Sequence, residues 1–130
     1  MANEITPFLM FEGPAEEAMR FYISLFEDSE VVSLVHFGEG HSHAGKVQMA
    51  KFRLGKQTLL CMDSTVHHAF TFTPSVSLFV ECGSEDEIER LYKALGEGGQ
   101  ALMPIDNYGF SRRFGWVNDR FGVSWQVNLP

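Results

Sequence analysis

Two adjacent histidines and a nearby carboxylate form the most suggestive chemical grouping in the chain. His67 and His68 follow Asp63 by four and five residues. Because histidine changes charge near neutral pH and a carboxylate can orient it, this spacing suits general acid–base catalysis. The three residues are therefore candidate catalytic groups, and a structural or solvent-facing role for the two histidines is the simpler interpretation.

A second histidine pair lies in the segment GEGHSHAG, residues 38–45. His41 and His43 have the His-x-His spacing that can grip a metal ion, and Glu39 is close by. A closed metal site needs three or four ligands of suitable geometry. We therefore interpret this segment as a flexible surface loop.

The elements that must position these residues follow from the apolar periodicity. A strand, an amphipathic helix and three further strands are predicted at residues 5–11, 14–26, 30–37, 46–54 and 57–63. The same order then returns. A strand at 72–82 precedes a helix that starts with a Ser84–Glu87 capping box and ends at a Gly96 C-cap, and three more strands are predicted at residues 100–106, 109–119 and 122–129.

Short matches support a duplication. Thr6-Pro7 recurs as Thr73-Pro74 after 67 residues, and Leu25 recurs as Leu95 after 70 residues. Recurrence of five elements in one order is the sign of an internal repeat. The chain is therefore predicted to be a single domain, residues 1–130, made of two βαβββ modules at about 4–63 and about 72–130, with a linker at about 64–71.

Each module is expected to leave one face of its sheet uncovered, since one helix covers only the other face. An exposed apolar face is costly, and two such faces can curve around a shared cavity. We predict an α+β fold in which curved mixed sheets surround a cleft, with a small-molecule ligand in the cleft between the modules.

Strand alternation selects the side chains expected to line this cleft. The last strand should turn a polar set toward it and an apolar set toward a helix; the polar set is Ser124, Gln126 and Asn128. Gln48, Ala50 and Phe52 are likewise predicted to share a face. The full set of predicted ligand-binding residues is Gln48, Phe52, Ser75, Ser77, Tyr108, Arg112, Trp116 and Gln126, with Phe110 also near the opening. Such a lining suits an uncharged or weakly polar molecule better than a phosphate.

Three stretches carry a family resemblance. They are ITPFLMFEGPAEEAMRFYISLF, FTPSVSLFVEC with the acidic helix start after it, and FGWVNDRFGVSWQV. Together with the paired modules they resemble the vicinal oxygen chelate superfamily of glyoxalase I, extradiol dioxygenases and bleomycin-resistance proteins. The last stretch is similar to an Asp-x-[Tyr/Phe]-Gly-Val-x-Trp-Gln strand of its PhnB-like branch, often labelled a 3-demethylubiquinone methyltransferase domain. The resemblance covers about residues 4–129 and implies a glyoxalase-like fold and a homodimer.

The resemblance also bears on cofactors. Methyl transfer from S-adenosylmethionine usually needs a glycine-rich turn that opens a helix, whereas the glycine cluster at 96–99 follows one, so we expect neither this activity nor this cofactor. Metal-using members hold a divalent ion with His, Glu or Gln, and the matching positions here are Pro7, Gln48, Ser75 and Gln126. Because these four offer at best two neutral amides and a hydroxyl, we expect no metal centre.

Composition limits the partners and the location. A formal net charge of −7 argues against nucleic acid, whose phosphates need a basic surface. The apolar runs are far shorter than the roughly 20 residues that span a bilayer, and the N-terminus lacks a signal-peptide pattern. Cys61 and Cys82 lie in strand-like apolar stretches and are predicted to be buried thiols in a reducing compartment. We therefore expect a cytoplasmic protein without nucleic-acid or membrane partners.

These observations favour a small-molecule-binding protein of the superfamily, without the usual metal centre and with no assigned activity. One alternative is an enzyme, either metal-dependent like the lyases and dioxygenases or metal-free with a histidine or aspartate as general base. Another alternative is a structural or dimerisation module, because one fold hosts many functions.

Overall fold

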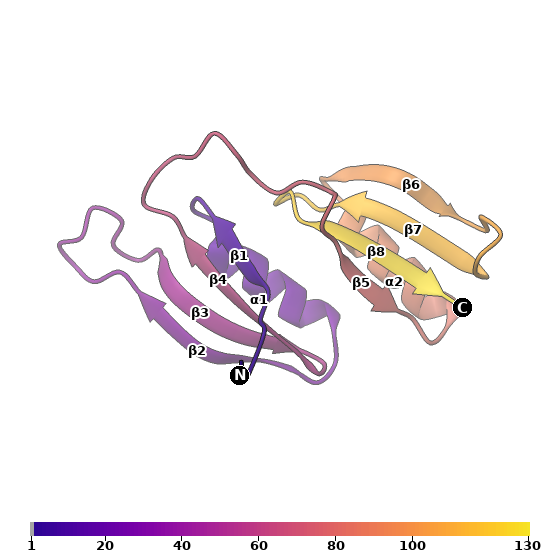
Figure 1. The fold of residues 1–130 in the computed structure, drawn as a ribbon, viewed down its shortest axis with the longest axis horizontal. Helices are drawn as coiled ribbons and strands as arrows, with labels where there is room; N and C mark the ends of the chain where they lie inside the picture. The colour runs from indigo at the N-terminus through magenta and orange to yellow at the C-terminus, as the bar shows by residue number, and fades with distance from the viewer. Residues whose placement is uncertain (1) are drawn as a thin grey trace. The chain divides into compact units, whose positions relative to one another are not determined.

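The computed structural model describes residues 2–130 and divides them into two compact units (Figure 1). The first unit ends at His68 and the second begins at Ala69. Each unit has its own buried apolar core, in which its helix packs against its sheet.

The first unit packs one helix on a four-stranded sheet. Its elements are β1 (Phe8–Phe11), α1 (Ala15–Leu25), β2 (Ser29–His36), β3 (Val47–Leu54) and β4 (Gln57–Asp63). The strand order is β1-β4-β3-β2, with β1 parallel to β4 and the other neighbours antiparallel. Its core holds Met19 and Tyr22 of the helix together with Phe52 and Leu59 of the sheet, all at most 1% exposed.

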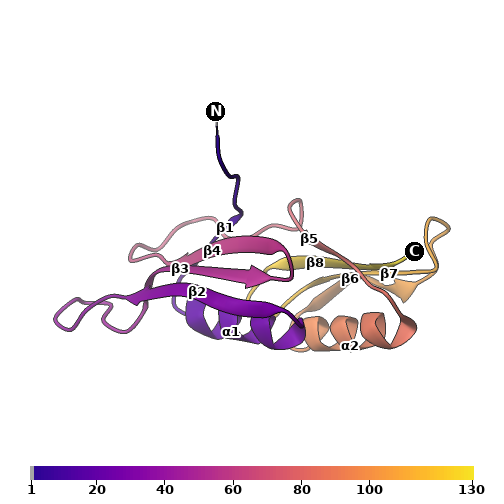
Figure 2. The same ribbon diagram turned by 90° about the horizontal axis from the view of Figure 1, so that it is seen from below.

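The second unit repeats this arrangement. Its elements are β5 (Leu78–Glu81), α2 (Glu85–Gly96), β6 (Gln100–Asp106), β7 (Arg113–Asn118) and β8 (Ser124–Leu129). The strand order β5-β8-β7-β6 matches that of the first unit position by position, including the parallel first pair. Figure 2 shows that a helix lies along one side of the sheet in each unit. The predicted α+β fold of two βαβββ modules is thereby confirmed.

β7 and β8 are shorter than predicted, since they begin at Arg113 and Ser124 instead of residues 109 and 122. The first and fifth strands are also shorter. The first begins at Phe8 instead of residue 5, and the fifth begins at Leu78 instead of residue 72. A proline precedes each start, Pro7 directly and Pro74 in a turn four residues earlier. Because proline has no backbone N–H, it cannot donate a hydrogen bond to a neighbouring strand, so a strand tends to begin after it.

The boundaries of α2 follow the predicted signals with one shift. Ser84 Oγ accepts a hydrogen bond from Glu87 N at 3.1 Å, and Glu87 Oε1 accepts one from Gly83 N at 2.8 Å, which gives the expected capping arrangement. The helix continues through Gly96, and the residue with left-handed backbone is Gly98, at φ +74°. The helix therefore ends within the glycine cluster, with Glu97 at the C-cap position, one residue after the predicted Gly96.

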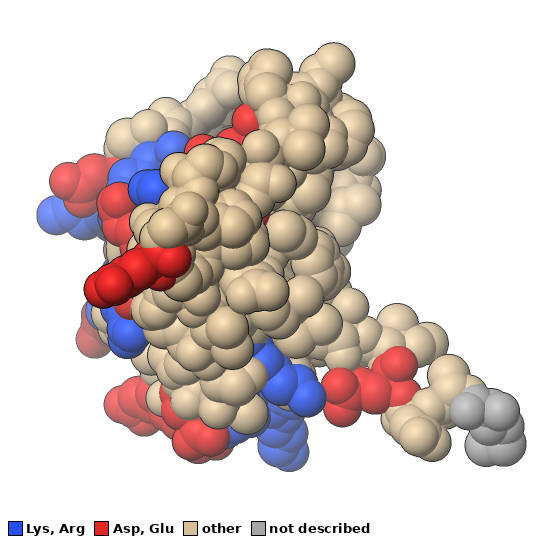
Figure 3. All heavy atoms as spheres, turned by 90° about the vertical axis from the view of Figure 1, so that its left-hand side faces the viewer, with Lys and Arg blue, Asp and Glu red and all other residues tan. Residues whose placement is uncertain are grey.

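Positive and negative side chains are interspersed on the surface. On the face shown in Figure 3, Lys and Arg side chains lie beside Asp and Glu side chains. Ion pairs such as Arg20–Glu16 and Arg53–Glu30 join opposite charges within the first unit. No helix among residues 2–130 is long and apolar enough to cross a membrane.

Candidate functional site

Alternation along β8 separates a face under the helix from a face turned away from it. Val127 lies on the helix side, because it adjoins Gly115, against which the Tyr92 ring of α2 packs. The opposite face carries the predicted polar set Ser124, Gln126 and Asn128. We call the side of the second sheet that faces away from α2 the open face.

A hydrogen-bond network occupies the middle of the open face. Trp116 Nε1 donates to Ser124 Oγ at 2.8 Å, and the Ser124 and Ser77 hydroxyls are 2.7 Å apart. Gln126 Nε2 donates to Ser77 Oγ at 3.2 Å. The structure thus brings together three predicted site residues, from β7, β8 and the residue before β5; Ser124 joins Trp116 to Ser77, and Ser77 in turn bonds to Gln126.

An aromatic cluster adjoins this network. Phe79 is the register partner of Gln126, and its ring lies 6.5 Å from that of Phe114, centroid to centroid. The Phe110 and Tyr108 rings lie 5.0 Å and 6.2 Å from Phe114. Three of these side chains remain exposed, Phe79 at 53%, Phe110 at 63% and Tyr108 at 39%. Exposed aromatic rings gathered beside a polar network form a surface that can bind an apolar molecule and orient it.

Sequence reasoning found half of this cluster. It placed Tyr108 and Phe110 near an opening but did not name Phe79 or Phe114. The alternation that selected Ser77 also selects Phe79, two residues further along the same strand, so the signal was present. Phe114 stands two residues before Trp116 on β7, so the same alternation places it on this face too, although it is only 5% exposed.

Ser75 and Arg112, two other predicted site residues of the second unit, lie outside the network. Ser75 precedes β5, and its hydroxyl is 2.8 Å from that of Thr73. Arg112 Nε donates to the carbonyl of Pro130 at 3.1 Å, so it is attached to the C-terminal residue and not to the polar centre. Both side chains are exposed, and within residues 2–130 neither is hydrogen-bonded to Ser77 or Gln126.

The face predicted for the first hairpin is wrong. A register shift between β2 and β3 makes Gln48 an extra residue in its strand, and Gln48 is exposed. Ala50 and Phe52 are both 0% exposed, in the core beneath α1. Because a bulge changes which side the following residues face, Gln48 does not share a face with the other two, and Phe52 is a core residue of its unit.

Asp63 has a structural position. It is 2% exposed, and its carboxylate accepts hydrogen bonds from three backbone N–H groups. Oδ1 accepts from Gly13 N at 2.8 Å and Ala15 N at 3.0 Å, and Oδ2 accepts from Val47 N at 2.9 Å. The carboxylate thus caps the start of α1 and ties it to β3, which Pro14 at the N-cap position cannot do with its own side chain.

The adjacent histidines pair with other partners. His67 Nδ1 lies 2.8 Å from Glu12 Oε1, and this hydrogen bond lowers the pKa of the Glu12 carboxyl. His68 Nε2 lies 2.9 Å from Ser64 Oγ, while the His68 N–H donates to Glu12 Oε2 at 3.3 Å. The His67 side chain is 89% exposed. The predicted grouping of Asp63 with the two histidines is therefore replaced by a solvated grouping around Glu12.

The metal positions of the superfamily do not fit a divalent ion in this chain. Pro7 offers no side-chain donor atom, the Ser75 hydroxyl is bonded to Thr73, and the Gln126 amide donates to Ser77. The exposed Gln48 adds only a neutral amide. Within residues 2–130, no group of three or more His, Cys, Asp or Glu side chains is arranged to hold a metal ion.

The loop between β2 and β3 is held by its own contacts. The His41 ring stacks on Phe37 at 4.3 Å between centroids, and His43 N donates to His41 Nδ1 at 2.9 Å. His41 is exposed, and Glu39 next to it is exposed as well. These contacts order the loop locally.

The two cysteines are free and buried, as predicted. Burial raises the pKa of Cys61 to about 12 and that of Cys82 to about 11. Since the thiolate is the reactive form, neither side chain is set up as a nucleophile at neutral pH.

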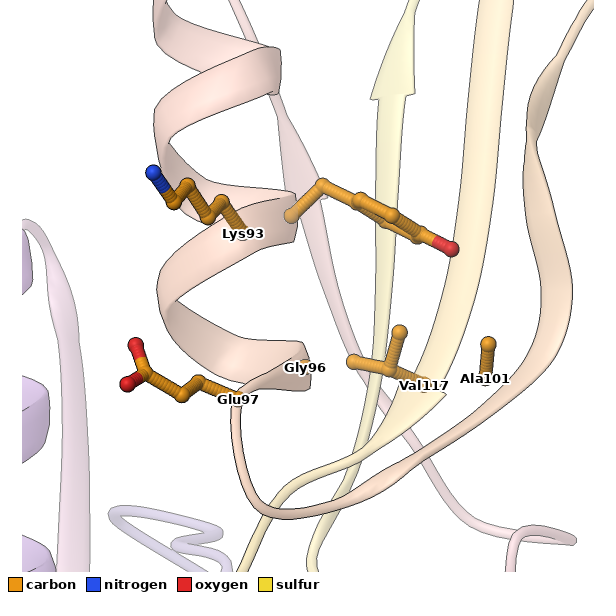
Figure 4. Close-up of a pocket in the computed structure, with 6 residues that line it drawn as sticks. Lys93, Gly96, Glu97, Ala101 and Val117 are labelled. Atoms are coloured by element: carbon orange, nitrogen blue, oxygen red, sulfur yellow. The ribbon is translucent and has the colours of Figure 1, made fainter.

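A separate cavity lies on the other side of the second sheet. Its volume is about 350 Å³, and it is lined by Tyr92, Lys93, Gly96, Glu97, Ala101 and Val117. Figure 4 shows Ala101 and Val117 on the strand side, while the Lys93 and Glu97 side chains point away from them. None of the predicted site residues lines this cavity, so it is separate from the polar network and aromatic cluster of the open face.

With this geometry in place, comparisons with known proteins identify the family. The family model for 3-demethylubiquinone-9 3-methyltransferase matches residues 3–128. The chain belongs to this family. The PhnB protein of Bacillus cereus is 50% identical and has a TM-score of 0.95, with 98% of this chain and 100% of that chain covered. A Pseudomonas aeruginosa protein is 29% identical with a TM-score of 0.86, and 98% of each chain is covered.

Solved structures of much lower sequence identity share the fold with this member of the 3-demethylubiquinone-9 3-methyltransferase family. A glyoxylase/bleomycin resistance protein/dioxygenase domain from Frankia is 12% identical with a TM-score of 0.66 over 99% of this chain and 93% of that one. The fosfomycin resistance protein of Listeria monocytogenes is 13% identical with a TM-score of 0.64 over 100% and 94%. These likenesses show a glyoxalase-like fold. No curated protein matches the chain.

Proposed function

We propose that the protein binds a small, neutral, largely aromatic molecule on the open face of its second sheet. The observation that carries this proposal is the aromatic cluster of Phe79, Tyr108, Phe110 and Phe114 beside the Ser77–Ser124–Gln126–Trp116 network. Partly exposed rings next to fixed polar groups are the usual composition of a small-molecule site. The proposed function is the small-molecule binding predicted from the sequence, and its proposed site is the open face of the second sheet.

The charges around the open face favour a neutral ligand. Arg113 is engaged with Glu85 and Glu89 of α2, and Arg112 is bonded to Pro130. Glu81 accepts a hydrogen bond from Asn128, which adds negative character to the same face. Since an anionic ligand would need a free cation there, phosphates and carboxylates are poor candidates.

Methyl transfer, which the family's description states, is not what these residues support. An anion or nucleotide-like cofactor commonly binds where a helix N-terminus offers free N–H groups. At α1 the Asp63 carboxylate already accepts from Ala15 N, and at α2 Ser84 already accepts from Glu87 N. The glycines at 96–99 end a helix instead of opening one.

Metal-free catalysis is the second candidate, and the pairing of His67 with Glu12 is the observation that favours it. An imidazole beside a carboxylate can exchange a proton with a bound molecule. We rank it below binding, because the His67 side chain is largely solvated and a general base works best when solvent is excluded. The two free, buried cysteines support a reducing, cytoplasmic location for either function.

Binding of 2-naphthol, measured by calorimetry and by saturation-transfer NMR, tests the proposal. We expect wild-type protein to bind it and Phe79→Ser to weaken binding by roughly tenfold, since an aromatic contact is lost. Phe37→Ser, which removes a partly exposed ring from the β2–β3 loop, is the matched control and should bind as wild type does. Absence of binding, or equal loss in both variants, contradicts the proposal.

A further inference from the structure

The cavity beside the end of α2 can be compared with the corresponding place in the first unit. Leu25 of α1 and Leu95 of α2 are 70 residues apart, and both are buried. Phe26 directly follows Leu25, whereas Gly96 directly follows Leu95. The helix end that lines the cavity therefore carries a glycine where the first unit has a large aromatic side chain.

The strands opposite the helix end show the same difference. Val31 of β2 is the register partner of Phe52 in β3, and Ala101 of β6 is the register partner of Val117 in β7. Phe52 and Val117 are both core residues, at most 1% exposed, and each pair lies near the start of the outer strand of its sheet. Both side chains of this pair are smaller in the second unit, where alanine takes the place of valine and valine that of phenylalanine.

The three smaller side chains account for the space beside α2. Tyr22 of α1 is 0% exposed, whereas Tyr92, 70 residues later in α2, is partly exposed and lines the cavity of about 350 Å³. Protein interiors are normally packed without voids of this size, and small-molecule sites typically have volumes of about 300–1,000 Å³. Ala101 is exposed, so the cavity can be reached from solvent.

The lining favours an apolar occupant. Ala101 and Val117 form the strand side, and Gly96 adds no side chain on the helix side. Lys93 and Glu97 also belong to the lining, but Figure 4 shows their side chains pointing away from Ala101 and Val117. Because a charged group against the strand side would lose its hydration without gaining a partner, an uncharged molecule fits this cavity better.

We propose that this cavity is a second binding site, which takes a compact, uncharged, apolar molecule of one to three small rings. The site lies on the helix side of the second sheet, so it is distinct from the open face and does not depend on the function proposed above. The corresponding positions of the first unit carry the larger Phe26, Val31 and Phe52, so we expect this site in the second unit alone.

Titration with 1-adamantanol, followed by two-dimensional amide NMR, tests the proposal. This probe is compact and apolar, and its saturated rings cannot stack on the aromatic cluster of the open face. We expect saturable shifts of the Gly96, Ala101 and Val117 amide signals, with a Kd of roughly 0.1–1 mM.

Two variants fill the cavity from opposite sides. Gly96→Phe introduces the side chain that the first unit has at this position and should weaken binding roughly tenfold or more. A Cβ at Gly96 would lie 3.6 Å from Val117 Cγ1, which is an ordinary contact, and the Gly96 backbone is not left-handed. Ala101→Val adds two methyl groups on the strand side and should also weaken binding.

The controls make each outcome decisive. Ala44→Val adds the same two methyl groups at an exposed loop residue and should bind the probe as wild type does. Absence of saturable shifts in wild type, binding unchanged by both filling variants, or equal weakening in Ala44→Val overturns the proposal. Thermal melting reports the folding of each variant, and Ala101→Val decides if Gly96→Phe does not fold. Gly96→Phe should leave the binding of 2-naphthol on the open face unchanged, so the two proposals can fail separately.

Discussion

At the scale of single residues, two buried carboxylates accept hydrogen bonds from backbone N–H groups and fix the local backbone. Asp63 accepts from three N–H groups in the first unit. In the second unit, Asp119 accepts from the N–H groups of Phe121 and Val123 and from Trp125 Nε1. Each carboxylate accepts from donors that would otherwise lack a hydrogen-bond partner, at a cost of about 1–3 kcal/mol for each buried donor. Both residues therefore work in the architecture of their unit.

Asp63→Asn tests this role for the first unit. The substitution removes the charge and turns an N–H group toward a backbone N–H, so we expect the free energy of unfolding to fall by about 2–4 kcal/mol. Urea denaturation followed by circular dichroism gives the measurement. Asp106→Asn, an exposed residue that accepts only from the neighbouring Asn107 N–H, is the control and should change stability by less than about 0.5 kcal/mol. A change of similar size in both variants would argue against the structural role.

At the scale of elements, the distance between α2 and its sheet depends on a glycine. A Cβ at Gly115 of β7 would lie 2.7 Å from Tyr92 Cδ2, closer than real contacts allow. The Tyr92 ring therefore packs directly on the backbone of β7, which keeps the helix near the strand that also carries Phe114 and Trp116 on its other face. This contact therefore supports β7 from the side opposite the open face.

Gly115→Ala should accordingly destabilise the protein by about 1–3 kcal/mol, because the ring or the helix must shift. The thermal midpoint reports the change. Gly38→Ala is the matched control, since a Cβ there meets nothing within 4 Å and its backbone is not left-handed. The double variant Gly115→Ala with Tyr92→Leu should recover part of the loss; if it recovers none, the clash with the ring is not the cause.

At the scale of the whole molecule, duplication gives each unit a sheet face that its own helix does not cover, together with exposed apolar side chains. In the first unit these side chains include Phe8 at 45%, Met49 at 39% and, on the edge strand β2, Val32 and Val35 at 50% and 52%. Exposed apolar side chains gathered on one region of a protein surface commonly mark an interface. The homodimer implied by the family resemblance stays a prediction, and these side chains give it a physical reason.

Sedimentation equilibrium measures the association state directly. We expect a mass of twice the 14.7 kDa chain, largely insensitive to added salt because apolar contacts are not screened. Dissociation on raising the ionic strength would point to an ionic interface instead. A species of 14.7 kDa at all concentrations would contradict the prediction.

The sequence by itself determined the elements, their order, their duplication and the polar face of β8, because strand alternation, helix periodicity and capping signals are local. It also selected Ser77, Trp116 and Gln126, whose faces follow from regular strands. It failed at Gln48 and Phe52, where a register shift depends on the pairing of β3 with β2.

Only the tertiary structure decided the rest. It showed that Asp63 caps a helix 48 residues away in sequence, that His67 pairs with Glu12, and that Phe79 and Phe114 meet beside Gln126. Each of these depends on which strands become neighbours, and that is set by long-range pairing, which no local pattern in a single chain encodes.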